Sequence, residues 1–186
     1  MLVRDSASGS SPVSLGRALG VVSLALVLSA CEKGGAGAES PGGKHPLLGN
    51  PAPEFDLPAQ SGGKRASLSA SEGKVVLVDF WATWCGPCRA SFPKYEALSK
   101  KLEDDLVIIG IAEDDEPDGI GDFAKETGAS FVLAWDNGKS IASRYHPDSM
   151  PTSFIVDKNG LVRFVHAGFR EGDEKQIEAQ VKSLLE

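Results

Sequence analysis

Cysteine, histidine and long apolar runs are scarce in this chain, and each scarcity excludes a class of protein. The 186 residues include only three cysteines and three histidines, and they contain one close-spaced pair where a zinc site of about four ligands usually has two. The uncharged N-terminal stretch 18–30 has thirteen residues, whereas a membrane-spanning helix needs about twenty. The net charge of −7 argues against nucleic acid as a partner.

The composition that remains is that of an ordinary globular protein. Hydrophobic residues make up 41% of the chain and charged residues 24%, which is typical of a soluble domain. The length predicts one domain of ordinary size, and the sequence contains no internal repeat. We therefore expect one folded unit preceded by a segment of different character.

That preceding segment predicts export and anchoring. Arg17 stands before the uncharged stretch and small residues end it, which is the pattern of a secretory signal peptide. The segment 28–31, Leu-Ser-Ala-Cys, resembles a bacterial lipobox, whose cysteine is lipidated, so we expect a lipid anchor on Cys31. The predicted organisation is a lipoprotein signal peptide (1–30), the lipidated cysteine with a flexible Gly-rich tether (31–48), and a folded domain (49–186).

The close cysteine pair, Cys85 and Cys88, lies between a predicted strand and a predicted helix. The run 75–80 is apolar, β-branched and of strand length, and Pro87 suits a first helical turn. This order places Cys85 at a helix N-terminus, where unpaired N–H groups and the helix dipole favour a thiolate. We expect Cys85 to attack a partner disulfide and the more shielded Cys88 to resolve the mixed disulfide.

Two other interpretations of the pair are weaker. A structural disulfide across so small a loop would remove little entropy from the unfolded chain. A zinc site would need further ligands, and Cys31, His45, His146 and His166 contain no second close-spaced pair. A strand followed by Cys-x-x-Cys and a helix is typical of redox-active cysteines.

The rest of the chain alternates between strand and helix patterns. Strand 75–80, helix 85–102 and strand 106–112 form a crossover unit, and Asn159-Gly160 marks a hairpin turn. The other predicted elements are strands 54–57, 65–68, 131–134, 153–156 and 161–166, and helices 120–127, 140–145 and 174–185.

Three segments resemble those of one known family. The segment 79–88, Asp-Phe-Trp-Ala-Thr-Trp-Cys-Gly-Pro-Cys, is similar to the active-site segment of thioredoxins, and Pro93 stands where thioredoxins kink their first long helix. The segment 150–160 resembles the cis-proline segment and its hairpin. Together with 49–55, Gly-Asn-Pro-Ala-Pro-Glu-Phe, these residues resemble the TlpA/ResA-like branch of the thioredoxin family, within the redoxin (AhpC/TSA) group, over residues 49–186.

The resemblance implies an α/β, thioredoxin-like fold with a central mixed β-sheet flanked by helices and an added N-terminal β-hairpin. It implies a thiol–disulfide oxidoreductase with no cofactor beyond its redox-active disulfide. It also implies a reductive role outside the cytoplasm, at the periplasmic or outer cell surface, on protein disulfides such as those of apocytochrome c or copper-site cysteines. A membrane thiol-transfer protein would supply the electrons.

The resemblance also assigns site residues. Catalysis falls to Cys85, Cys88, Asp79 and Pro151, with a cis peptide bond before Pro151. Substrate contact falls to Trp84, Gly86, Pro87, Met150 and Thr152.

Two acidic residues keep two interpretations each. Asp79 interrupts an apolar strand, so it is either a buried proton acceptor for Cys88 or a half-solvated carboxylate at the strand end. Glu113 ends the strand that follows the active-site helix, so it either tunes the cysteine pair or is a solvated loop acid.

Two rival functions fit the sequence less well. A peroxiredoxin-type peroxidase would need a Pro and a Thr or Ser at fixed spacing before its reactive cysteine, and here Val78 and Ala82 occupy those positions relative to Cys85. A non-enzymatic thioredoxin-fold copper carrier would use a wider cysteine spacing and a downstream histidine. Metal titration of the reduced protein distinguishes the copper carrier from the redox protein.

Overall fold

The computed structural model describes residues 45–63 and 65–186. The predicted signal peptide, the predicted lipidation site Cys31 and most of the predicted tether lie outside these residues. The strands are β1 (Asp56–Ser61), β2 (Arg65–Ser67), β3 (Val75–Trp81), β4 (Leu106–Ala112), β5 (Val132–Trp135), β6 (Thr152–Val156) and β7 (Val162–Ala167). The helices are η1 (Ser69–Ser71), α1 (Gly86–Lys101), α2 (Ile120–Thr127), η2 (Asn137–Lys139), α3 (Ala142–Tyr145) and α4 (Asp173–Ser183).

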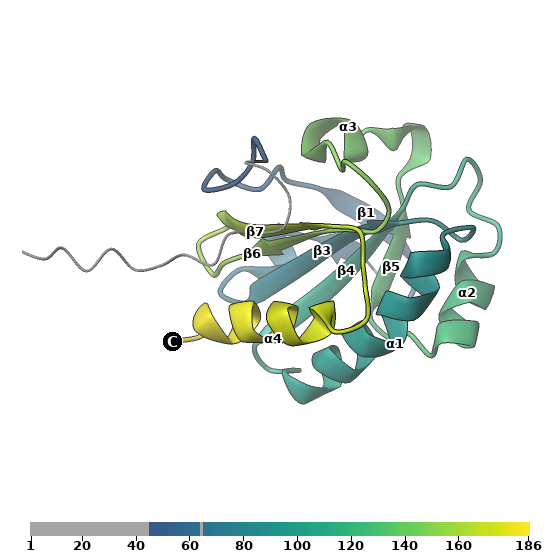
Figure 1. The fold of residues 1–186 in the computed structure, drawn as a ribbon. Coiled ribbons are helices and arrows are strands. Elements are labelled where there is room, and N and C mark those ends of the chain that lie inside the picture. The colour runs from purple at the N-terminus through teal and green to yellow at the C-terminus, as the bar shows by residue number, and fades with distance from the viewer. Residues whose placement is uncertain (1–44, 64) are drawn as a thin grey trace, which may run out of the picture. The chain divides into compact units, whose positions relative to one another are not determined.

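The strands form one mixed sheet in the order β2-β1-β5-β4-β3-β6-β7 (Figure 1). The central strand β3 pairs in parallel with β4 and antiparallel with β6, and β7 pairs antiparallel with β6. Every residue of β3 is buried, because helices or loops cover both faces of the sheet centre. This burial explains why the strand reads as a continuous apolar run in the sequence.

Side chains of β3 alternate between two hydrophobic cores, as they must in any strand. The odd-numbered residues Val75, Leu77 and Trp81 join the core that contains buried residues of α1, α2 and α4. The even-numbered residues 76–80 join a second core with Ile141 and Tyr145 at α3. Figure 1 shows the same division, with α1 and α4 on one side of the sheet and α3 on the other.

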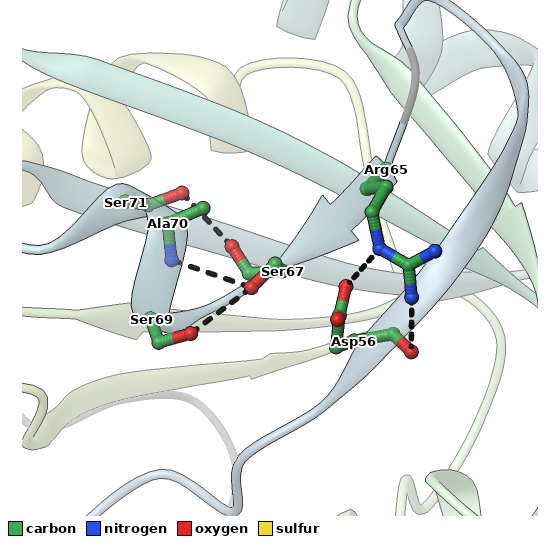
Figure 2. A network of polar contacts seen from close by, with 6 residues as sticks. All are labelled: Asp56, Arg65, Ser67, Ser69, Ala70 and Ser71. Carbon is green, nitrogen blue, oxygen red and sulfur yellow. Dashed lines mark hydrogen bonds and ion pairs between the residues drawn. The ribbon is translucent and has the colours of Figure 1, made fainter.

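The N-terminal hairpin forms one edge of the sheet. Strand β1 pairs with β2 over residues 56–58 and continues against β5 as far as Ser61. Arg65 Nε donates to Asp56 Oδ1 at 2.6 Å, and Ser67 Oγ accepts from the Ala70 N–H at 3.3 Å, which fixes the turn into η1 (Figure 2). The sequence predicts the first strand at 54–57, whereas β1 begins at Asp56 and ends at Ser61. The strand is longer than predicted because its pairing with β5 continues beyond the apolar residues.

The other predicted elements agree with the structure to within two residues. Helix α1 begins at Gly86 with Cys85 as its N-cap and contains Pro93 in its interior, and the Met150–Pro151 peptide bond is cis, as the sequence predicts. The mixed sheet flanked by helices confirms the predicted fold class. Within the part of the chain that the structure describes, no helix is long and apolar enough to cross a membrane.

Candidate active site

The cysteine pair lies where β3 ends and α1 begins. Cys85 and Cys88 form a disulfide with a Cα–Cα distance of 5.3 Å. Cys85 is the N-cap of α1, and its Sγ accepts a hydrogen bond from the Cys88 N–H at 3.2 Å. The first turn of α1 contains Pro87 and no acidic side chain, so the helix dipole at Cys85 is not offset locally by a carboxylate.

The surroundings of the two sulfurs differ. Cys88 is fully buried, whereas Cys85 keeps 3% of its surface exposed. Trp84, Gly86 and Pro87 are all exposed around Cys85, and Trp84 exposes 71% of its surface. A large exposed indole beside a sulfur that reaches the surface is the kind of apolar surface that often marks protein–protein contacts.

The cis-proline segment is fixed by its own hydrogen bonds. Thr152 Oγ1 donates to the Ser149 carbonyl at 2.7 Å, and the Gly168 N–H donates to the Pro151 carbonyl at 2.7 Å. Met150 packs against the core that contains both cysteines. The cis segment is therefore bonded to the loop after β7 and packs on the same hydrophobic core as the cysteines.

A groove opens beside the cysteine motif on the side of β7. It has a volume of about 300 Å³ and is lined by residues of the motif and of the β7–α4 connection, namely Pro87, His166, Ala167, Gly168, Phe169, Arg170 and Asp173. A groove that starts at the cysteine motif can take chain that flanks a substrate cysteine.

The loop before Cys85 is held by Asp114, a contact that the sequence analysis missed. The Asp114 carboxylate accepts from the Thr83 N–H at 3.1 and 3.2 Å and from Thr83 Oγ1 at 2.6 Å, and Trp135 Nε1 donates to the Asp114 carbonyl at 2.8 Å. Arg89 Nη2 donates to the Thr83 carbonyl at 3.1 Å. These bonds hold the backbone at Thr83, between the end of β3 and Cys85. In the sequence, the acidic loop after β4 is the only signal for them.

Asp79 is completely buried on the same face of the sheet as the cysteines. Its Oδ1 accepts a hydrogen bond from Ser153 Oγ at 2.5 Å, and its Oδ2 has no hydrogen-bond partner among the described residues. Burial raises the pKa of Asp79 to about 8, against the smaller lowering effect of the Ser153 hydrogen bond. Of the two interpretations of Asp79, the half-solvated strand end is excluded by its burial.

Glu113 lies in a different environment from the cysteine pair. Its N–H donates to the Trp81 carbonyl at 2.8 Å, and only 4% of the residue is exposed. Burial raises its pKa to about 7, with Asp136 adding to the rise and Lys139 opposing it. The alternation along β4 points its side chain to the α3 face, opposite the cysteines, so its role in tuning them stays a prediction.

The histidines have protein partners rather than a shared site. His45 Nε2 lies 3.1 Å from the His146 carbonyl, and His166 Nε2 lies 2.6 Å from Gln180 Oε1. In residues 45–63 and 65–186, no cluster of three histidine, cysteine or acidic side chains could hold a metal ion.

Known proteins are similar to this chain in sequence and fold. Residues 47–181 match the Redoxin family. The chain is 38% identical to the thioredoxin-like protein YneN of Bacillus subtilis over 124 residues, which cover 64% of this chain and 71% of YneN. It is 33% identical to the thiol-disulfide oxidoreductase ResA of Bacillus thuringiensis over 138 residues, which cover 74% of this chain and 78% of ResA.

Solved structures of thioredoxin-like proteins are similar to this chain as well. A Chlorobium tepidum protein described as a thiol:disulfide interchange protein DsbE superposes with a TM-score of 0.70 at 35% identity, over 75% of this chain and 98% of that one. StoA of Bacillus subtilis, at 20% identity and a TM-score of 0.58 over 69% of this chain and 96% of its own, shares the fold. With the Cys85–Cys88 disulfide at the N-terminus of α1, these similarities show that the chain belongs to the redoxin family, in its TlpA/ResA-like thioredoxin-fold branch, and that it is a thiol–disulfide oxidoreductase.

Proposed function

We propose that this protein is a membrane-anchored reductant of protein disulfides outside the cytoplasm. The observation that carries the proposal is the placement of Cys85 at the start of α1, beside the exposed Trp84 and a groove that begins at Pro87. This surface suits a folded or extended protein chain rather than a small molecule. The names of ResA and DsbE favour disulfide chemistry on other proteins.

In the proposed reaction, the reduced Cys85 thiolate attacks one sulfur of a substrate disulfide. A bond forms between the Cys85 sulfur and that substrate sulfur, and the second substrate sulfur leaves as a thiolate. Cys88 then attacks Cys85 in the mixed disulfide, which releases the first substrate sulfur and leaves Cys85 and Cys88 oxidised. The two electrons gained by the substrate come from the cysteine pair.

Asp79 is the proposed proton acceptor for Cys88. Thiolates, not thiols, attack disulfides, and Cys88 is buried away from water. Asp79 is the buried carboxylate on the same sheet face, and its Oδ2 has no partner within the described residues. The remaining site residues act on the substrate: Pro151 and Met150 from the cis segment, Thr152 by fixing that segment, and Trp84, Gly86 and Pro87 as the rim around Cys85.

The proposed substrates are exported proteins whose cysteines must be reduced before they bind a cofactor, such as apocytochrome c or copper-site proteins. A membrane thiol-transfer protein would reduce the pair again, and no bound cofactor takes part. The lipid on Cys31 would hold the domain at the periplasmic or outer surface of a membrane.

Two experiments test the proposal. Full-length protein with Cys88→Ser, expressed in its own host, should accumulate as mixed disulfides with cysteine pairs of exported proteins, identified by mass spectrometry of non-reduced complexes. Complexes that contain only cytoplasmic proteins contradict the proposed location. For the anchor, Cys31→Ser should release a soluble form or block processing, and an unmodified Cys31 thiol in the mature protein overturns lipidation.

A further inference from the structure

A row of residues crosses the sheet under α1. Asp79 on β3 lies opposite Gly110 on β4 and opposite Ser153 on β6, and Ser153 lies opposite His166 on β7. Residues directly opposite one another on neighbouring strands share a face of the sheet. Because Gly110 has no side chain, the polar neighbour of Asp79 in this row is Ser153.

Ser153 is the middle of a buried chain of hydrogen bonds. Its Oγ donates to Asp79 Oδ1 at 2.5 Å and lies 2.8 Å from the Tyr95 hydroxyl. Tyr95 and Asp79 are fully buried, and Ser153 exposes 1% of its surface. An ionised carboxylate can only accept hydrogen bonds. When Asp79 is ionised and able to take a proton, the single Ser153 proton is therefore used on Asp79, and the Tyr95 hydroxyl donates to Ser153.

The chain connects three elements of the active site. Tyr95 lies seven residues after Cys88 on α1, which is two helical turns and therefore the same face of the helix. Ser153 lies two residues after the cis Pro151. The ring of Tyr95 packs edge-on against Phe169 at 5.8 Å between centroids, and Phe169 lines the groove beside the cysteine motif.

We propose that Ser153 and Tyr95 are positioning residues that occupy Asp79 Oδ1 and leave Oδ2 to take the proton of Cys88. The inference rests on the proposed role of Asp79. When the mixed disulfide resolves, the Cys88 S–H bond breaks and its proton passes to Oδ2. The Cys88 sulfur bonds to Cys85, and the substrate sulfur leaves with the electron pair of its broken S–S bond. Oδ1 remains an acceptor before and after the transfer, so the two hydroxyls keep their hydrogen bonds.

Other titratable groups face this row and must be separated from Asp79 in any pH experiment. They are Cys85 at the N-cap of α1, Cys88 and Tyr95 on α1, His166 on β7 and Asp173 at the start of α4. His166 is paired with Gln180, and the Asp173 carboxylate accepts from the Arg170 N–H at 2.7 Å. Burial lowers the pKa of His166, which favours its neutral form near pH 7.

The test is the pH dependence of mixed-disulfide resolution, measured by rapid mixing in Ser153→Ala and Tyr95→Phe. Because the acceptor must be ionised, the rate rises with pH through the pKa of Asp79. Ser153→Ala removes a hydrogen bond that favours the ionised form, so we expect the rise to move up by about one pH unit and resolution at pH 7 to slow about tenfold. Tyr95→Phe should slow it about threefold, because it acts through Ser153.

Matched controls come from the opposite face of the sheet and from the short helix η1. Tyr145→Phe removes the hydroxyl of another fully buried tyrosine, which donates to the Pro53 carbonyl at 2.9 Å. Ser71→Ala removes a buried serine hydroxyl that donates to the Ser67 carbonyl at 3.1 Å. Neither variant should move the pH profile, so the pair distinguishes loss of this chain from loss of any buried hydroxyl.

A double variant shows whether Ser153 acts through Asp79 or only supports the fold. In an Asp79→Asn background, adding Ser153→Ala should change the resolution rate by less than about twofold, since the group that Ser153 acts on is absent. The proposal is overturned if Asp79→Asn alters the profile while Ser153→Ala and Tyr95→Phe do not. If Asp79→Asn itself matches the parent, the role of Asp79 fails and the positioning role fails with it. Should Ser153→Ala not fold, Tyr95→Phe carries the test, because its ring packing is kept.

Discussion

On the α3 face of the sheet, Phe80 packs with Tyr145 and Phe154, with ring centroids 5.1 to 5.7 Å apart. The Tyr145 hydroxyl on that face donates to a backbone carbonyl. On the α1 face, the neighbouring residues of the same strand are Asp79 and Trp81, both fully buried. Asp79 Oδ2 and Trp81 Nε1 both lack a hydrogen-bond partner among the residues the structure describes.

The difference shows how one strand serves two purposes. A buried polar atom without a partner costs about 1–3 kcal/mol, so β3 gives up stability on its α1 face that it does not give up on its aromatic α3 face. Among the described residues outside β3, Glu113 Oε1 and Gln180 Nε2 also lack a partner. The two unpaired groups of β3 lie on the side that carries Cys85 and Cys88. Local conflicts with burial are expected where a protein carries out chemistry, and the alternation of β3 confines them to one face.

The largest effect should come from the sulfurs. In purified protein, Cys85→Ser should lose disulfide exchange by a factor on the order of a thousand or more, because the nucleophile at the N-terminus of α1 is gone. Cys88→Ser should still attack and then stop at the mixed disulfide. Non-reducing gels and mass spectrometry of a disulfide substrate measure both. Equal trapping by Cys88 in the Cys85→Ser variant would reverse the assigned roles.

The next effect concerns the unfolding free energy of the oxidised protein. Asp79 has a pKa of about 8 when folded and 3.8 as its ordinary value, so the folded state binds more protons between these pH values. Its contribution to stability is therefore present at low pH and is lost as pH rises towards about 8. The unfolding free energy of Asp79→Asn, relative to that of the parent, should therefore rise by roughly 3 kcal/mol from pH 5 to pH 8.

Denaturant unfolding at the two pH values measures this difference. Glu113, whose pKa is raised to about 7, contributes in both proteins and cancels from the comparison. If the difference in unfolding free energy between the two proteins is the same at pH 5 and pH 8, the protonation state of Asp79 does not change between these pH values. That result would contradict the raised pKa of Asp79 on which the comparison of the two faces depends.

A smaller effect should follow from adding a methyl group to the crowded core beside Trp81. A methyl group at Gly110 would lie 2.6 Å from Leu133 Cδ2 and 2.9 Å from Trp81 Nε1, so Gly110→Ala should cost about 2 kcal/mol of unfolding free energy through overpacking. The control is Gly121→Ala in α2, where nothing lies within 4 Å of the added carbon and a small gain is expected. Equal effects of the two variants would contradict the tight packing of the α1 face.

The smallest effect concerns the loop between β3 and the cysteines. Thr83→Val removes the 2.6 Å hydrogen bond to the Asp114 carboxylate and keeps the shape of the side chain. We expect a loss of about 1 kcal/mol in stability and a few-fold slower first attack by Cys85, because the position of the loop is less fixed. Stopped-flow kinetics of mixed-disulfide formation measures the rate. An unchanged rate would mean that α1 alone positions Cys85.

Local patterns were sufficient to predict most of the helices and strands and the position of the cysteine pair. The apolar run 75–80, Pro87 and the cysteine spacing act within a few residues of one another, so the strand, the helix start and the N-cap position of Cys85 could be predicted. The resemblance to thioredoxins predicted the cis bond before Pro151, which the structure contains.

Contacts between distant parts of the chain could not be predicted in this way. Ser153 and Asp79 are 74 residues apart, and Thr83 and Asp114 are 31 apart, so both pairs depend on strand register. Glu113 shows the same limit, because its position at the end of β4 was predictable but the face of its side chain depends on the alternation of the strand.

The reduction potential of the Cys85–Cys88 couple tests the central claim, a reductive role, most directly. The Cys85 sulfur accepts a hydrogen bond from a neutral backbone N–H, and the buried Asp79 disfavours a nearby thiolate when it is ionised. Both features stabilise the reduced form less than a cationic neighbour would. We expect a potential near that of thioredoxin, about −270 mV, in equilibrium with glutathione or a thioredoxin standard at pH 7. A value near −120 mV, that of a dedicated oxidant, would contradict the proposed direction of transfer.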